Sequence, residues 1–101
     1  MEQIERKYDN EGNLLVLVAH GFGAGFSTWL QPEAALDSRL IEAVQKGIVG
    51  DDLKNLMKEL GYNVGVADYY VEIEKVPKGT MFYIHEYDGA ESIVTDNIWE
   101  A

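Results

Sequence analysis

The stretch Leu14-Leu15-Val16-Leu17-Val18-Ala19 is the longest run of apolar residues in this chain. Because apolar and polar residues do not alternate in it, the run predicts a strand that is buried on both faces. Another strand is expected just before it, over Ile4 to Tyr8. The intervening residues 9–13 are rich in turn formers, and Gly12 is free to take a positive φ. The two strands are therefore predicted to form a hairpin.

Two helices are expected further along the chain. The first is predicted from Ser38 to Lys46, with Asp37 as its N-cap and Gly47 near its end. The second is predicted from Asp52 to Leu60 and ends at Gly61. Its apolar residues have the spacing of a single helical stripe. They are Leu53, Leu56, Met57 and Leu60.

The last third of the chain predicts strands again. Tyr69 to Val76 is expected to form one strand, and Pro77-Lys78-Gly79 is a compact turn. Thr80 to Tyr87 is then the returning strand of this second hairpin. Ser92 to Val94 adds a short edge strand, and Trp99 is expected to close the core.

This order of elements predicts a single α+β domain over residues 1–101, which is the length of one domain. The expected architecture is an antiparallel sheet of four to five strands, in the chain order ββααββ with a further short strand. Both helices are expected to pack on one face of this sheet. The other face would then be wet or free to bind a partner.

The net charge is the strongest global signal in the composition. Asp and Glu number 18 against 8 Lys and Arg, which gives −10. Such a field repels phosphate groups, so direct binding of nucleic acid or of an anionic membrane is not expected. It would steer the chain towards basic surfaces, including the clefts in which proteins hold DNA or RNA. The alternative is that the charge serves solubility alone.

Other features of the composition limit the environment and the chemistry. The absence of cysteine excludes disulfides, thiolate metal sites and a cysteine nucleophile, and it fits a reducing cytoplasm. The longest apolar run is far shorter than the roughly 20 residues that a membrane helix needs. The first residues lack the basic start and apolar core of a secretory signal.

The glycine-rich segment after the apolar strand has some likeness to two catalytic motifs. Val18-Ala19-His20-Gly21-Phe22-Gly23 is similar to the oxyanion loop of α/β-hydrolases, but the chain has no Gly-x-Ser-x-Gly elbow. Gly21, Gly23 and Gly25 miss the Gly-x-Gly-x-x-Gly spacing of the Rossmann fingerprint, and the P-loop lysine is absent. We therefore predict neither an enzyme nor a bound cofactor.

A glycine loop of no named motif can still bind an anion through its backbone N–H groups. Phe22, Phe26 and Trp29 lie around this loop and can stack on a flat ligand such as a base. The alternative is that these rings plug the core while the glycines let the chain pass closely. Both interpretations stay open at the level of sequence.

Tyrosine is the other candidate for binding, because the chain has six tyrosines. Tyr83, His85 and Tyr87 share one face of a predicted strand, and tyrosine buries a large area at low entropic cost in interfaces. An ordinary wet sheet face is the alternative. His85 could also approach Glu72 or Glu74 across the predicted hairpin, although no metal-ligand spacing supports a metal site.

The Gly21–Gly25 loop and the turn from Asp88 to Glu91 each end a predicted strand, so we expect them to meet in space. The candidate binding residues come from the loop, the returning strand and the turn. They are Gly21, Phe22, Gly23, Gly25, Phe26, Trp29, Tyr83, His85, Tyr87, Asp88 and Glu91.

Three stretches together resemble a group of small bacteriophage and prophage proteins that have no established activity. They are Lys7 to Gly12, Gly21 to Trp29, and Val76 to Ile93; Gly21-Phe22-Gly23-Ala24-Gly25-Phe26-Ser27-Thr28-Trp29 is the most specific part. Proteins of this group often carry tryptophan at the position of Phe26 and a residue other than histidine at that of His20. The resemblance covers nearly the whole chain. It implies an origin inside infected bacteria, hence the cytoplasm, and it implies no activity.

Three hypotheses for the function follow. The first is a non-catalytic protein that docks on a bacterial host or defence protein, such as a nuclease or a CRISPR effector, and inhibits it through an acidic surface. The second is a small-ligand binder that sequesters a nucleotide-like signal at the Gly21–Gly25 loop. The third is a structural or accessory protein that acts as a homo-oligomer through its open sheet.

Overall fold

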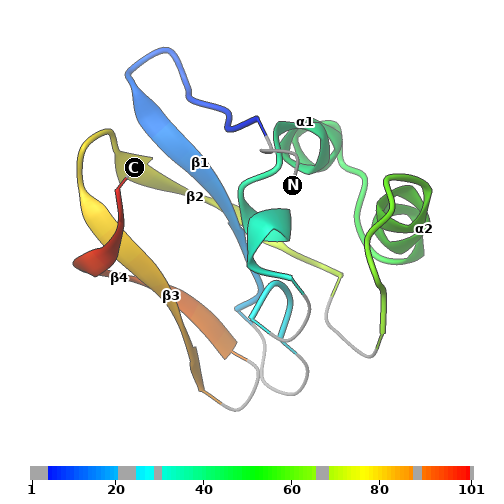
Figure 1. The fold of residues 1–101 in the computed structure, drawn as a ribbon. Helices are drawn as coiled ribbons and strands as arrows, with labels where there is room; N and C mark the ends of the chain where they lie inside the picture. Colours follow the sequence, from blue (N-terminus) through cyan, green and yellow to red (C-terminus); the bar gives the residue numbers. More distant parts are fainter. Residues whose placement is uncertain (1–4, 21–24, 29–30, 66–68, 88–89, 101) are drawn as a thin grey trace.

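The structure is a computed structural model that describes residues 5–20, 25–28, 31–65, 69–87 and 90–100. It contains two α-helices, one short 3₁₀ helix and four strands, and the α+β class is confirmed. The elements in chain order are β1 (Asn13–Val18), η1 (Pro32–Ala35), α1 (Ser38–Gln45), α2 (Asp51–Glu59), β2 (Glu72–Pro77), β3 (Met81–Tyr87) and β4 (Ala90–Glu100). Figure 1 shows β1 and β2 in the middle of the molecule, with the helices on one side and β3 and β4 on the other.

Strand β1 is the centre of the fold. All its residues from Leu14 to Val18 are at most 2% exposed, which confirms a strand buried on both faces. It pairs antiparallel with β2, from Asn13 opposite Pro77 to Val18 opposite Glu72. Two packed layers are needed to bury both faces of one strand, so this strand determines the layered architecture.

Both helices cover one face of β1. Leu15 and Leu17 pack in one cluster with apolar residues of the helices, which are Leu40 and Ile41 of α1 and Leu53 and Met57 of α2. The helix bounds differ from those predicted by at most one residue at either end. The carboxylate of Asp37 accepts a hydrogen bond from the Arg39 N–H at 2.9 Å, which confirms Asp37 as the N-cap of α1.

The other face of β1 is covered by strands. Leu14, Val16 and Val18 pack in a second cluster with Val76 and Phe82, against which Ile84 and Ile93 also pack. In the described part of the chain, the four strands form two separate two-stranded sheets, β1–β2 and β3–β4. The predicted single sheet is therefore not confirmed. The face expected to stay open is covered by the β3–β4 hairpin, because the alternate residues of β1 on that side are also apolar.

The described part of the N-terminal segment, residues 5–8, does not form the strand that was predicted over Ile4 to Tyr8. Among its described residues, Tyr8 forms an isolated bridge with Leu14, and the Lys7 carbonyl accepts a hydrogen bond from the Leu15 N–H at 2.9 Å. The chain turns at Asp9, whose carboxylate accepts hydrogen bonds from the backbone N–H groups of residues 11 and 13. This Asx-type turn replaces the longer hairpin pairing.

The C-terminal strand is much longer than the predicted Ser92 to Val94. Strand β4 has 11 residues and pairs antiparallel with β3. The predicted pairing of β3 with β2 is not found among the described residues. The register shifts between Phe82, which lies opposite Trp99, and Tyr83, which lies opposite Val94. In the part of the chain that the structure describes, no helix has the length and apolarity needed to cross a membrane.

Candidate functional site

Glu91 is the best-connected polar residue in the region of the predicted site. It lies in β4 and is only 1% exposed. One carboxylate oxygen, Oε1, accepts a hydrogen bond from the Ala19 N–H at 2.9 Å. The other, Oε2, accepts from the Phe26 N–H at 2.9 Å, the Thr28 N–H at 3.0 Å and the Thr28 hydroxyl at 2.6 Å. The backbone of Glu91 also donates to the Ala19 carbonyl at 2.6 Å.

These contacts bring the end of the predicted turn onto both flanks of the glycine-rich segment. Ala19 precedes that segment, and Phe26 and Thr28 lie at its far end. The backbone N–H groups of the flanks converge on one carboxylate, which is the arrangement of an anion-binding nest. An anion of the protein itself therefore takes the N–H groups of Ala19, Phe26 and Thr28 on the two flanks of the segment.

Several predicted site residues lie outside the described residues. They are Gly21, Phe22, Gly23, Trp29 and Asp88. The described candidates fall into two groups. Gly25, Phe26 and Glu91 are at the buried junction just described, whereas the residues of β3 lie on the surface of the hairpin.

Phe26 belongs to the core. Its side chain is 0% exposed and packs in the cluster between β1 and the helices. Its ring meets that of Tyr69 edge to face, with the ring centroids 6.3 Å apart. For this aromatic residue the structure therefore favours the core alternative over stacking on a ligand.

The outer face of β3 carries two exposed candidates, His85 and Tyr87, and the half-buried Tyr83. Tyr83, His85 and Tyr87 alternate with Phe82 and Ile84, which point into the core. Tyr87 is 70% exposed, and His85 is also exposed. The ring of His85 meets that of Tyr83 edge to face, with the centroids 6.5 Å apart. These three side chains form an aromatic row on one side of the hairpin.

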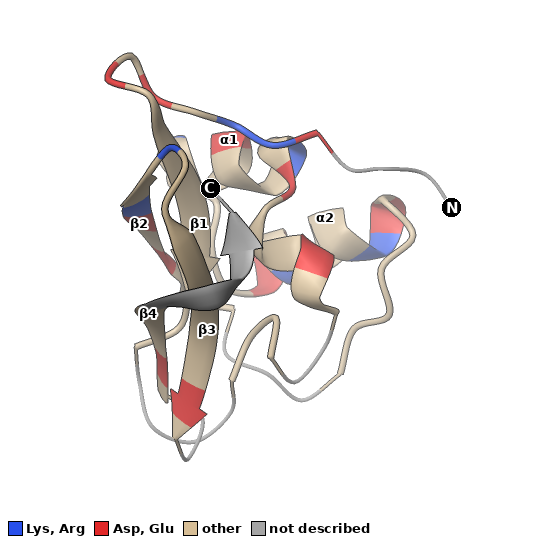
Figure 2. Ribbon diagram, turned by 60° about the vertical axis from the view of Figure 1, so that its left-hand side comes forward, with Lys and Arg blue, Asp and Glu red and all other residues tan. Residues whose placement is uncertain are grey.

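The acidic charge is distributed unevenly along the chain. Residues 79–101 contain five acids and no Lys or Arg, which gives −5 and hence half of the net charge of −10. The acids are Glu86, Asp88, Glu91, Asp96 and Glu100. In the described part of β3 and β4, Figure 2 shows acidic positions and no basic one. Per residue, this stretch of sequence is thus more acidic than the rest of the chain, and one of its five acids, Glu91, is buried.

A histidine does contact Glu72 and Glu74, but it is His20. Its Nε2 lies 2.9 Å from a Glu74 carboxylate oxygen and 3.4 Å from one of Glu72. The predicted approach of His85 to these acids is wrong, because β2 pairs with β1 and brings the end of β1 beside Glu72. The described residues hold no group of three side chains that could bind a metal ion.

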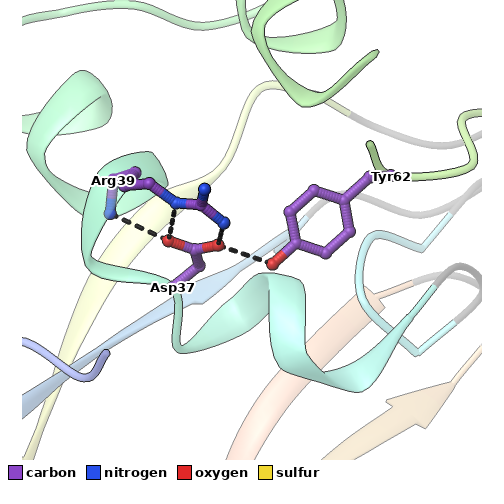
Figure 3. A network of polar contacts seen from close by, with 3 residues as sticks. All are labelled: Asp37, Arg39 and Tyr62. Atoms are coloured by element: carbon purple, nitrogen blue, oxygen red, sulfur yellow. Dashed lines mark hydrogen bonds and ion pairs between the residues drawn. The ribbon is translucent and has the colours of Figure 1, made fainter. Parts of the chain in front are cut away.

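A second polar network lies at the start of α1 and was only partly foreseen. Asp37 is 1% exposed, and its carboxylate accepts hydrogen bonds from the Arg39 side chain at 3.0 and 2.7 Å and from the Tyr62 hydroxyl at 2.6 Å (Figure 3). Burial by itself would raise the pKa of Asp37, but these hydrogen bonds outweigh it and hold the pKa below its ordinary value. Burial and the neighbouring carboxylate raise the pKa of Tyr62.

The geometry of this network indicates a structural role. It joins the N-terminus of α1 to the segment that follows α2, and its carboxylate already has its partners. The N-cap was visible in the sequence, whereas no sequence signal identified Tyr62 as the second partner.

Comparison with known proteins adds no relative, since no family model, curated protein or solved structure matches this chain.

Proposed function

We propose that this protein is a non-catalytic binding protein that docks on a basic bacterial protein and inhibits it. The observation that carries the proposal is the coincidence of charge and exposed aromatic surface on one hairpin. Residues 79–101 hold half of the net charge, of which only the buried Glu91 is shown to be shielded from solvent, and the same hairpin exposes Tyr87 and His85. Interfaces are enriched in tyrosine, and electrostatic complementarity gives them speed and specificity of association.

The chemistry of the surface indicates the class of target. A strongly acidic surface competes for the basic clefts in which other proteins hold nucleic acid. The resemblance to small phage and prophage proteins favours a target in the bacterial cytoplasm, such as a defence nuclease or a CRISPR effector. Inhibition would then consist of occupying the cleft and excluding the nucleic acid.

The sequestering of a nucleotide-like ligand at the glycine-rich segment has less support. The Glu91 carboxylate takes the backbone N–H groups of Ala19, Phe26 and Thr28, so they are not available to a phosphate. Its negative charge would also repel one. The side chain of Phe26 is buried and presents no face to a base.

A homo-oligomer also has less support. The exposed Tyr87 lies within residues 79–101, the acidic stretch of the chain. Like charges on two copies of this stretch would repel each other. Light scattering at low and high salt tests this alternative. A stable dimer at low salt would favour self-assembly over docking on a basic partner.

The experiment that tests the proposal is affinity capture followed by a salt titration. The tagged chain is incubated with a nuclease-treated bacterial lysate, and bound proteins are identified by mass spectrometry. We expect one stoichiometric protein with a basic surface, inhibited by the chain in its own assay. Affinity should fall steeply with added salt, because exposed charges are screened within about 8–10 Å at 0.10–0.15 M ionic strength. An affinity that is independent of salt would rule out the acidic docking mechanism.

A further inference from the structure

We infer that the outer edge of strand β2 is a second binding surface of this protein, and that it takes up an extended segment of another protein in which basic and apolar residues alternate. This inference goes beyond the proposed function, because it rests on another element and does not depend on the β3–β4 hairpin. The mode of binding is strand addition, in which backbone hydrogen bonds supply affinity and alternate side chains supply specificity.

The two edges of the β1–β2 sheet differ. The outer edge of β1 is partly covered, because the Leu15 N–H donates to the Lys7 carbonyl at 2.9 Å and the Ala19 carbonyl accepts from the Glu91 N–H at 2.6 Å. No strand in the described part of the chain pairs with the outer edge of β2, and Figure 2 shows β2 at the margin of the molecule beside β1. An edge of this kind is a template for pairing with another chain.

The register determines which backbone groups of β2 face outward. Hydrogen-bonded and non-hydrogen-bonded positions alternate in an antiparallel pair. The N–H of Leu15 points away from β2, so Leu15 and the opposite Lys75 form a non-hydrogen-bonded pair, as do Leu17 and Ile73 two positions along. The N–H and C=O groups of Ile73 and Lys75 therefore point to the outer edge. Pro77 has no N–H to offer and ends it.

Two carboxylates lie beside this edge. Glu72 and Glu74 are opposite Val18 and Val16, so both project on the same side of the sheet, and their side chains are 74% and 43% exposed. The ring of His20 contacts one oxygen of each carboxylate and leaves the other oxygens to further donors. A strand added to β2 places its own side chains next to these acids, where Lys or Arg forms favourable cross-strand pairs.

The opposite side of β2 selects apolar residues. Ile73 is half-buried and packs against the cluster between β1 and the helices. An apolar side chain of an added strand would extend this cluster. Because successive residues of a strand face opposite sides, a segment that pairs with both sides of β2 must alternate between basic and apolar residues.

A second copy of the chain does not fit this edge. In antiparallel pairing of two β2 edges, like charges lie directly opposite each other in every register centred on Ile73, Glu74 or Lys75. These pairs are Glu72 with Glu74, Glu74 with itself and Lys75 with itself, respectively. Like charges directly opposite are destabilising, so the edge favours a basic segment of another protein over self-pairing.

Position 75 offers a matched pair of variants. Lys75→Pro removes an outward N–H that takes no part in the pairing with β1, and proline is accepted at such positions of edge strands. Lys75→Ala removes the same side chain, including its ion pair with Asp9 at 3.5 Å, and keeps the N–H. The difference in binding between the two variants therefore reports the use of this backbone group.

The experiment titrates the isotope-labelled full chain at low salt with a capped peptide of alternating lysine and valine, about six residues long, the usual length of a strand. Amide hydrogen exchange then follows each N–H group. We expect exchange to slow at Ile73 and Lys75 but not at Glu74, whose N–H already faces β1. Lys75→Pro should bind the peptide about two- to tenfold more weakly than Lys75→Ala, the range for one backbone hydrogen bond.

The contribution of the carboxylates is tested with a second matched pair. Glu72→Gln should weaken binding of the peptide by up to about fivefold, the range for one cross-strand ion pair. Glu59→Gln makes the same change of charge at an exposed position of α2 and should leave binding unchanged. Equal effects of the two variants would show that only the net charge attracts the peptide.

N-methylated peptides test strand addition without altering the protein. One peptide is methylated at the backbone nitrogens of its valines and another at those of its lysines. In an added strand only one of these sets of N–H groups faces β2, so one peptide should lose binding and the other should keep it. Equal binding of both peptides, protection confined to residues outside β2, or no binding of the parent peptide would overturn the inference. The proposed function would stand in each case, because it is decided by the salt dependence of the captured partner.

Discussion

Asp37 and Glu91, the two buried carboxylates among the described residues, are stabilised in different ways. Each is 1% exposed. Asp37 receives its hydrogen bonds from the guanidinium of Arg39 and the hydroxyl of Tyr62 as well as from one backbone N–H. Glu91 receives three from backbone N–H groups and one from the hydroxyl of Thr28. The charge of Asp37 is paired with a positive charge, whereas the donors to Glu91 among the described residues are neutral dipoles.

The difference also concerns distance along the chain. Arg39 lies two residues from Asp37, whereas the donors to Glu91 lie 63 to 72 residues away. Asp37 therefore organises one helix start and its neighbour. Glu91 joins β4 to the end of β1 and to the segment before η1, and so ties the second sheet to the first. Loss of Glu91 should accordingly disturb the tertiary structure more than loss of Asp37.

The largest effect is expected for Glu91→Ala. This change leaves three backbone N–H groups and one hydroxyl without their acceptor at a buried junction, and an unsatisfied buried donor costs roughly 1–3 kcal/mol. We expect the free energy of unfolding to fall by about 3 kcal/mol, measured by urea denaturation. A loss below that of Asp37→Ala would contradict the ranking of the two carboxylates.

Glu91→Gln is the matched control for charge. The amide oxygen can take the place of Oε2 and keep the donors from Phe26 and Thr28, while the NH₂ group then faces the Ala19 N–H without accepting from it. We expect about half of the alanine effect. A glutamine variant as unstable as the alanine variant would show that the charge, rather than the number of acceptors, holds the junction.

The same two residues show what a sequence can reveal about this fold. Asp37 was predicted as an N-cap because capping depends on residues within one helical turn. The role of Glu91 was not predictable, because its donors are backbone groups that become neighbours only after β4 packs beside β1. The helices and the burial of β1 followed from local patterns. The pairing of strands, including β2 with β1 instead of β3, depends on long-range packing.

The same distinction between local pattern and long-range packing applies to the candidate site. The alternation of Tyr83, His85 and Tyr87 with Phe82 and Ile84 was visible in the sequence, because a strand places alternate residues on opposite faces. The burial of Phe26 was left open there, because an aromatic residue beside glycines serves a core and a ligand site equally well. Likewise, the contact of His20 with Glu74 follows only once β1 and β2 are paired.

A smaller loss is expected for Asp37→Ala. The change removes the N-cap of α1, worth about 1 kcal/mol, and leaves the partly buried hydroxyl of Tyr62 without its acceptor. The Arg39 side chain is 54% exposed and regains water, so we expect a total of about 2 kcal/mol in urea denaturation. Asp37→Asn keeps the cap and should lose about half as much. If Asp37→Asn is as unstable as Asp37→Ala, the loss of unfolding free energy comes from the negative charge of Asp37 and not from its capping hydrogen bond.

The pH dependence of stability sharpens the comparison further. The pKa of Asp37 is below its ordinary 3.8 in the folded protein, so its contribution is complete above about pH 4 and is lost as pH falls. The pKa of Tyr62 is above its ordinary 10.0, so its contribution is complete below pH 10 and is lost as pH rises beyond it. We expect Tyr62→Phe to cost about 1 kcal/mol at neutral pH.

The measurement is urea denaturation of both proteins between neutral pH and pH 11. The stability difference between wild type and Tyr62→Phe should narrow as pH rises above 10, because the unfolded tyrosine then ionises while the folded one resists. A difference that stays constant through this range would show that the hydroxyl of Tyr62 is not protected by its burial and by Asp37.

The smallest effect is expected for the rescue of the two alanine variants by added acetate. This test distinguishes backbone donors from side-chain donors. Glu91→Ala removes the equivalent of one acetate molecule, and the backbone N–H groups of Ala19, Phe26 and Thr28 converge on the position that it leaves. Added acetate should therefore bind and restore about 0.4–0.9 kcal/mol at concentrations of one to four times its Kd. Asp37→Ala should gain nothing beyond the effect of chloride at equal ionic strength, because its main donors, the side chains of Arg39 and Tyr62, are free to turn towards water.

Equal rescue of both variants would mean that the donors around Glu91 are no better ordered than those around Asp37. The difference between a backbone nest and a side-chain network would then have no energetic consequence in this protein.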